Sequence, residues 1–220
     1  MSVFSTIPPN YSTNEAAAIV QNYYGLTTNI SSLPSDRDQN FLCSSSEKKY
    51  VLKISNSDER KDVLEMQNEC IQFIHKFDSA LMVPLVVTGK TGNQIITIEK
   101  EETNHFLRLV EYLPGQFLKD IFHNNSMLYQ LGSFMGRLHK TMSRFDHPSA
   151  HRDFPWDIVH TYFIKSHKHH IPNGVEIVDH FIDLFEKNVL SNDNNLRKAV
   201  IHNDGNDHNI LINDQGNACG

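Results

Sequence analysis

The strand-like and helix-like stretches of this chain are segregated along the sequence. After a first helix, residues 31–113 are mostly short runs with strand character around one inserted helix, and residues 114–220 are mostly helical. Segregated strands and helices are typical of α+β architecture, because a parallel sheet of βαβ units requires alternation. We therefore predict a β-rich N-terminal nucleotide-binding lobe at 1–113 and a helical C-terminal lobe at 114–220, divided beside Pro114-Gly115.

Periodicity and turn residues predict the individual elements. Ser12 and Glu15 form a capping-box pattern that begins a helix, and Gly25 ends it. Residues 40–42 and 50–54 flank a polar turn and predict a β-hairpin. Further strands are predicted at 81–88, 94–99, 106–113, 199–201 and 210–212. Further helices are predicted at 57–77, at 128–142 (with Gly132 and Gly136 packed closely against a neighbour), at 157–164 and at 175–190.

A polar loop between two apolar runs, at residues 200–211, carries the most specific pattern. His202 and Asp204 form His-x-Asp, and four residues separate Asp204 from Asn209. This is the spacing of the catalytic loop in protein-kinase-like enzymes. Asp204 would accept the proton of an attacking hydroxyl, Asn209 would bind magnesium through its amide oxygen, and His202 would brace the loop. A polar loop with Asx turns is the alternative interpretation.

Two residues upstream follow in the chain order that the same chemistry requires. Lys53 lies inside the apolar strand 50–54, as the phosphate-binding Lys of kinases does. Glu69 lies in the following helix beside its apolar stripe, and a carboxylate on a buried face needs a partner, for which Lys53 is the natural choice. Glu65, one turn earlier, is the competing candidate. A surface Lys and a solvated Glu are the alternative.

Five segments together resemble a known family: 35–41, 50–54, 108–115, 131–139 and the loop 202–209. They resemble the aminoglycoside phosphotransferase and choline kinase superfamily, and within it the hydroxylysine kinase family. The resemblance implies a protein-kinase-like two-lobe fold, Mg²⁺, and ATP or GTP as the phosphoryl donor. It implies that the acceptor is a hydroxyl of a small amine or amino acid such as hydroxylysine. It also implies a hinge formed by Glu111, Tyr112 and Leu113, whose backbone groups form hydrogen bonds with the base of the nucleotide.

The chain departs from the family pattern at two places. Asn203 stands where the family has Gly, and we expect Asn to be tolerated because it adopts positive φ more readily than other non-glycine residues. The sequence also stops at Gly220, before the family's magnesium-binding Asp and the helices that follow it.

From this ending we expect an incomplete helical lobe, a strand at 210–212 without a pairing partner, and little phosphoryl transfer by the 220 residues alone. The alternative functions are a truncated, non-catalytic nucleotide-binding protein, or a kinase for aminoglycoside, choline or homoserine.

The charge balance and the absence of apolar runs bear on partners and location. A net charge of -6 argues against nucleic acid as the main partner, because an acidic surface repels phosphate backbones. No run is long enough to predict a membrane span, the N-terminus lacks a leader pattern, and the three cysteines are far apart, so we expect a cytoplasmic protein without a membrane partner. The histidine-rich stretch 167–170 is interpreted as a solvated helix end, not a metal site.

Overall fold

The computed structural model describes residues 8–154, 156–160 and 163–219, which belong to two compact units. The first unit contains Met1–Ala150 and Val200–Gly220, and the second contains His151–Ala199. Both predicted lobes contribute to the first unit, and the boundary at residue 113 stays a prediction. Residues 1–7 of the predicted first lobe, 161–162 of the predicted helix 157–164, and Gly220 lie outside the described residues.

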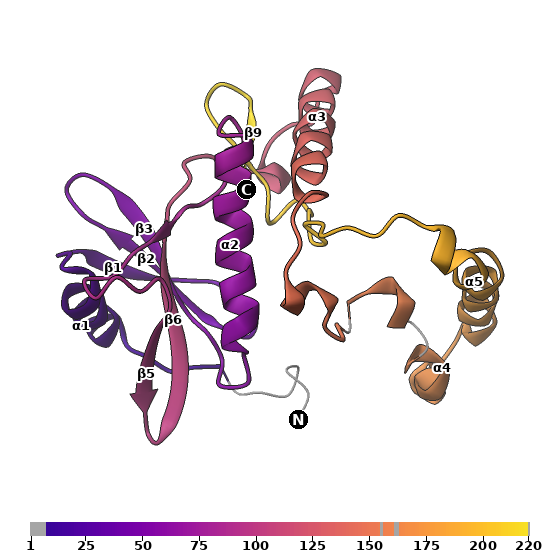
Figure 1. Cartoon of the computed structure of the whole chain (residues 1–220), viewed down its shortest axis with the longest axis horizontal. Coiled ribbons are helices and arrows are strands. Elements are labelled where there is room, and N and C mark those ends of the chain that lie inside the picture. The colour runs from indigo at the N-terminus through magenta and orange to yellow at the C-terminus, as the bar shows by residue number, and fades with distance from the viewer. Residues whose placement is uncertain (1–7, 155, 161–162, 220) are drawn as a thin grey trace. The chain divides into compact units, whose positions relative to one another are not determined.

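An antiparallel sheet organises the first part of the first unit (Figure 1). Its strand order is β1-β2-β3-β6-β4, and β5 also pairs with β6. The strands are β1 Asn29–Leu33, β2 Gln39–Ser44, β3 Lys49–Ile54, β4 Val86–Val87, β5 Ile96–Lys100 and β6 Thr103–Glu111. The predicted hairpin is confirmed, because β2 and β3 pair in an antiparallel register. The predicted strand 81–88 is reduced to β4, since Pro84 lacks the N–H that a strand interior requires.

The two faces of this sheet are chemically different, because alternate residues of a strand point to opposite sides. One face carries Phe41, Leu52 and Leu109, which lie opposite one another and are fully buried against helix α1 (Thr13–Tyr24). The other face carries Lys53 opposite Arg108, and Arg108 reaches helix α2 (Lys61–Phe77). The sheet thus packs against α1 through apolar side chains on one face and contacts α2 through polar side chains on the other.

Helix α1 begins and ends where its sequence predicts. The Ser12 hydroxyl accepts a hydrogen bond from the Glu15 N–H, and the Glu15 carboxylate accepts one from the Ser12 N–H. Gly25 ends the helix with a φ of 75°, a left-handed conformation that costs glycine little. The capping-box prediction is confirmed.

A second layer of the first unit is built on helix α3 (Asn125–Met142). After the short strand β7 (Gln116–Phe117) and the 3-10 turn η1 (Leu118–Asp120), α3 packs against α2 through Leu138 and Met142, both buried. A three-stranded sheet joins β7, β8 (Leu211–Ile212) and β9 (Ala218–Cys219) in that order.

Three sequence predictions for this layer were wrong. Strand β8 pairs with both β7 and β9, so the strand at 210–212 has partners on both sides. An added Cβ at Gly132 or Gly136 would meet nothing within 4 Å, so these glycines do not pack closely against a neighbour among the described residues. Residues 199–201 form no strand, although Val200 packs against the α2–α3 core.

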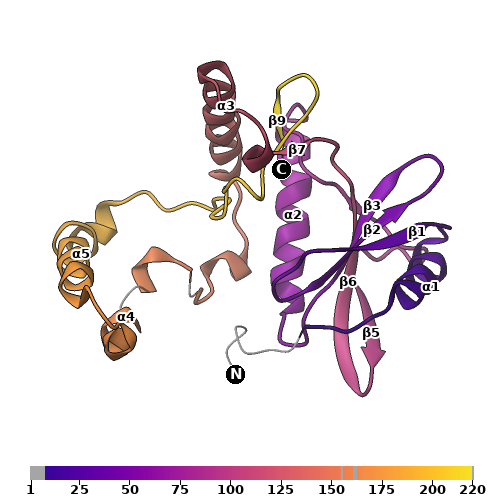
Figure 2. The same ribbon diagram turned by 180° about the vertical axis from the view of Figure 1, so that it is seen from behind.

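The second unit is helical (Figure 2). The short turn η2 (Pro148–His151) leads into it, and its elements are η3 Ile158–His160, α4 Phe163–His167, η4 Lys168–His170, α5 Val175–Asn188 and η5 Leu190–Asn195. Lys165 pairs with Glu186, and Lys168 pairs with Asp179, so two ion pairs tie the α4–η4 segment to α5. No helix among the described residues of either unit is long and apolar enough to cross a membrane.

Candidate active site

The loop between α5 and β8 brings two of the predicted site residues into direct contact. The Asn209 side-chain amide donates from Nδ2 to Asp204 Oδ2 at 2.7 Å and to the Asp204 carbonyl oxygen at 3.0 Å. Asn206 Nδ2 donates to the other carboxylate oxygen, Asp204 Oδ1, at 2.6 Å. The carboxylate is therefore held by two amides while it remains exposed to solvent. A group oriented in this way is able to accept a proton from an incoming hydroxyl.

The same contact fixes which atom of Asn209 is left for a metal. Because Nδ2 is committed to Asp204, the amide oxygen Oδ1 is the atom that remains for a ligand. Amide and carboxylate oxygens are the hard ligands that Mg²⁺ prefers. Within the part of the chain that the structure describes, no three His, Cys, Asp or Glu side chains gather as a metal cluster. Asn209 Oδ1 is therefore the atom of this side chain that could hold a magnesium ion.

Asn203 has the backbone conformation that the family's glycine suggests. Its φ is 64°, in the left-handed region where Asn is enriched among non-glycine residues. The expected positive φ is thus present, and the tolerance of Asn at this position stays a prediction.

His202 lies half-buried beneath the loop. A Cβ at Gly205 would lie 3.9 Å from His202 Nδ1, and this nitrogen is buried with no hydrogen-bond partner among the described residues. Burial lowers the pKa of His202, with the nearby Asp204 acting in the opposite direction, so a neutral imidazole is favoured. This position supports the bracing role predicted for His202, which stays a prediction.

Backbone contacts seat the loop on the rest of the first unit. The N–H of Lys119 donates to the Asp207 carbonyl at 3.1 Å, and the N–H of Leu118 donates to the Ile210 carbonyl at 2.9 Å. A Cβ at Gly205 would come within 2.9 Å of the Met135 methyl group, so the loop lies close on α3. The loop is thus supported by α3 and by the segment between β7 and α3.

Lys53 is half-buried in the middle of β3, on the sheet face that α2 covers. No hydrogen bond or ion pair within 4 Å joins its ammonium to another of the residues that the structure describes. Burial lowers the pKa of Lys53, the positive charge of Arg108 acts in the same direction, and Asp38 opposes both. An uncommitted cation in such surroundings is suited to an anionic ligand, which would restore its charged form.

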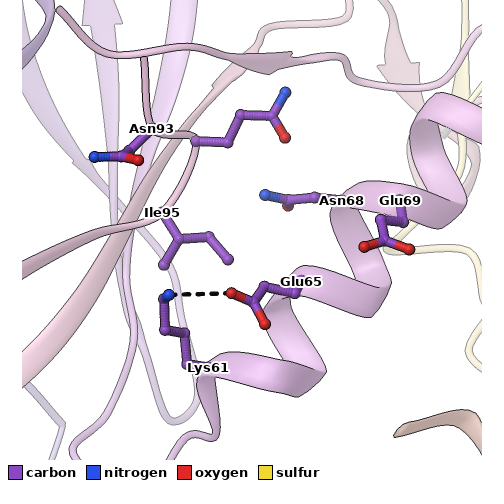
Figure 3. Close-up of a pocket in the computed structure, with 7 residues that line it drawn as sticks. Lys61, Glu65, Asn68, Glu69, Asn93 and Ile95 are labelled. Carbon is purple, nitrogen blue, oxygen red and sulfur yellow. Dashed lines mark ion pairs between the residues drawn. The ribbon is translucent and has the colours of Figure 1, made fainter. Parts of the chain in front are cut away.

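The structure does not bring Glu69 to Lys53, so the expected ion pair was wrong. The Glu69 side chain is 58% exposed, and its nearest ionic partner is His147, at 3.9 Å. The competing candidate Glu65 pairs instead with Lys61 at 3.1 Å. Both carboxylates lie on the side of α2 that faces the loop before β5, where a pocket is lined by Lys61, Glu65, Asn68, Glu69, Asn93, Gln94 and Ile95 (Figure 3). The rotation of α2 about its axis therefore takes both glutamates away from β3.

The predicted hinge begins at Glu111, the last residue of β6. The N–H of Glu111 donates to the Leu85 carbonyl at 2.8 Å, and the N–H of Tyr112 donates to the Lys49 carbonyl at 3.1 Å. These two donors are engaged within the protein, which leaves the Leu113 N–H and the carbonyls of the segment for a nucleotide base. The pairing of Glu111, Tyr112 and Leu113 with a base stays a prediction.

Sequence reasoning gave no role to Arg108 and Asp38. Arg108 is buried opposite Lys53, and Asp38 Oδ1 accepts hydrogen bonds from the Asn56 backbone and side chain, both at 3.1 Å. A charged residue inside the apolar run 106–113 is the same signal that singled out Lys53, and it would have identified Arg108. Asp38 stands in a polar turn, where nothing in the sequence distinguishes it from its neighbours.

Comparison with known proteins adds a family and a fold. A model of the phosphotransferase enzyme family matches residues 29–220. Hydroxylysine kinase from Bos taurus is 31% identical over 87% of this chain, and the enzyme from Mus musculus is 28% identical over the same share. In both comparisons the chain spans 56% of the length of the relative.

Solved structures with little sequence identity share the fold. An amicoumacin kinase in complex with AMP-PNP, Ca²⁺ and its ligand superposes with a TM-score of 0.71 at 15% identity, covering 96% of this chain and 63% of the other. A spectinomycin phosphotransferase in complex with ADP and spectinomycin gives 0.64 at 11% identity, covering 96% and 68%. The predicted α+β, protein-kinase-like fold is confirmed.

Proposed function

This chain belongs to the phosphotransferase enzyme family, and on that premise we propose that it moves the terminal phosphoryl group of ATP or GTP to a hydroxyl of a small amine or amino acid. The observation that carries the proposal is the loop in which Asn209 holds the Asp204 carboxylate at 2.7 Å. A kinase needs a carboxylate aimed at the acceptor beside an amide oxygen for the metal, and this loop supplies both.

The reaction divides among residues of this chain. The acceptor oxygen forms a bond to the terminal phosphorus, the bond from that phosphorus to the bridging oxygen breaks, and the hydroxyl proton passes to Asp204. Lys53 would bind phosphate oxygens, Asn209 would hold Mg²⁺ through Oδ1, and residues 111–113 would bind the base. When bound, Mg²⁺ neutralises phosphate charge. We also propose that residues 1–113 form the nucleotide-binding lobe.

The acceptor proposed is hydroxylysine or a compound like it. The support is that the curated relatives are named hydroxylysine kinase. We further propose that the protein acts in the cytoplasm on dissolved substrates, without a nucleic acid or membrane partner. Three buried free thiols, Cys43, Cys70 and Cys219, suit a reducing compartment.

A donor and acceptor panel tests this function on the full-length gene product that contains these 220 residues. ATP or GTP with Mg²⁺ is combined with hydroxylysine, and lysine is the matched control because it lacks only the hydroxyl. We expect mass spectrometry to find phosphorylated hydroxylysine and unchanged lysine. Transfer to choline, homoserine or an aminoglycoside in place of hydroxylysine would contradict the acceptor. Nucleotide binding without transfer to any hydroxyl would contradict the enzyme.

A further inference from the structure

Among the described residues, a buried arginine joins helix α2 to the sheet by hydrogen bonds, and no ion pair joins the two. Arg108 Nη1 donates to Asn68 Oδ1 at 2.8 Å, and Arg108 Nη2 donates to Gln67 Oε1 at 2.8 Å. Arg108 is only 9% exposed, and Asn68 is 3% exposed. The two amides are consecutive on α2, so one planar guanidinium contacts the helix at two adjacent points. This fork fixes both the position and the rotation of the helix more firmly than a single contact would.

The partners of this guanidinium are neutral, which distinguishes the contact from the expected Lys–Glu pair. A buried charge is costly unless hydrogen bonds satisfy it, and the two amide oxygens provide these without cancelling the charge. The carboxylates that act on Arg108 electrostatically are those of Asp38 and Glu59, and both lie outside α2. The segment of α2 that faces Arg108 therefore contributes hydrogen bonds and no negative charge.

Lys53 is the cross-strand neighbour of Arg108, and its ammonium takes no part in holding α2. The two residues are direct partners in the β3–β6 register, so both side chains leave the sheet on the same face. Like charges directly opposite each other on a sheet repel, and an anion bound beside them would relieve the repulsion. Among the described residues no carboxylate of α2 pairs with Lys53, since Glu65 pairs with Lys61 and Glu69 lies nearest to His147.

We infer that Arg108 is a positioning residue that docks α2 through Gln67 and Asn68, so that the docking of α2 is independent of Lys53 and the Lys53 ammonium stays free for donor phosphate. The first half concerns the fold alone, and the second half rests on the proposed function. The consequence is that loss of Arg108 loosens α2, whereas loss of Lys53 weakens phosphate binding and leaves α2 in place.

Hydrogen exchange of α2 in the full chain without nucleotide tests the docking. Arg108→Met removes the donors and keeps an unbranched side chain, and we expect the amides of residues 61–77 to exchange about ten-fold faster than in the parent. Asn68→Leu removes one acceptor and is expected to accelerate exchange in the same segment. Asn68→Asp keeps that acceptor and is the matched control, with exchange no faster than in the parent. Lys53→Met is expected to leave the exchange of α2 unchanged.

Two results would overturn the inference. One is equal acceleration of α2 exchange in Lys53→Met and Arg108→Met, and the other is unchanged exchange in both Arg108→Met and Asn68→Leu. If Arg108→Met does not fold, as judged by circular dichroism, the comparison of Asn68→Leu with Asn68→Asp decides the docking.

Titration with magnesium ATP and magnesium GTP tests the second half of the inference, that the Lys53 ammonium is free for donor phosphate. Lys53→Met should weaken nucleotide binding about ten-fold or more. A parent chain that binds neither nucleotide would refute the proposed function while the exchange results still stand.

Discussion

Asp204→Ala is expected to lower turnover of the full-length enzyme about 10²- to 10⁴-fold, the usual contribution of a positioned general base. The carboxylate is held by Asn206 and Asn209 in an orientation that alanine cannot reproduce. Nucleotide affinity should change little, because in the proposed reaction the carboxylate accepts the proton of the acceptor hydroxyl and does not bind the phosphates. Steady-state kinetics with the phosphorylated acceptor as the measured product give the turnover, and a nucleotide titration gives the affinity.

Asp207→Asn is the matched control for this loop. Asp207 is an exposed neighbour whose carboxylate lies 3.0 Å from His208 Nδ1, and within the described part of the chain it makes no hydrogen bond with Asp204. We expect it to retain most of the parent turnover. If Asp204→Ala turned over as fast as Asp207→Asn, Asp204 would not be the group that accepts the proton.

Lys53→Ala is expected to weaken binding of magnesium nucleotide about ten- to a hundred-fold, since charge-assisted hydrogen bonds to phosphate are lost. Because burial lowers the pKa of Lys53, the affinity of the parent should fall as pH rises into the range where this ammonium loses its proton. In Lys53→Ala this part of the pH dependence should disappear. Isothermal titration at several pH values measures both effects.

An exposed lysine on α2, Lys76, provides the control. Lys76→Ala removes the same charge from the chain and should leave both the affinity and its pH dependence as in the parent. Equal losses in the two variants would mean that general charge, and not the position of Lys53, attracts the nucleotide.

Local signals were sufficient to predict much of this fold. The α1 capping box and the β2–β3 hairpin depend on residues close together in the chain, so their sequence patterns carried the information. The loop 202–209 is similar, because its short length forces Asp204 and Asn209 together. The left-handed φ of Asn203 agrees with the expectation drawn from the family's glycine at this position and from the tolerance of Asn for positive φ.

Contacts between distant segments could not be predicted in the same way. The placement of Glu69 depends on the rotation of α2 against the sheet, which Arg108 sets from a strand some forty residues later. A shift of one residue along the helix decides whether a side chain faces Lys53 or solvent. The apolar stripe in the sequence does not define the rotation of the helix about its axis that closely. The pairing of β8 with β7 joins segments nearly a hundred residues apart, and no local pattern in either strand identifies its partner.

The central claim is that Lys53, Asn209 and Asp204 belong to one nucleotide phosphotransferase site. The most direct measurement is a crystal structure of the full-length gene product with Mg²⁺ and a non-hydrolysable analogue of ATP or GTP. We predict that the Lys53 ammonium contacts phosphate oxygens, that Asn209 Oδ1 ligates the metal at about 2.1 Å, and that the Asp204 carboxylate faces the terminal phosphate. A triphosphate bound away from Lys53, with a metal that Asn209 does not touch, would contradict the claim.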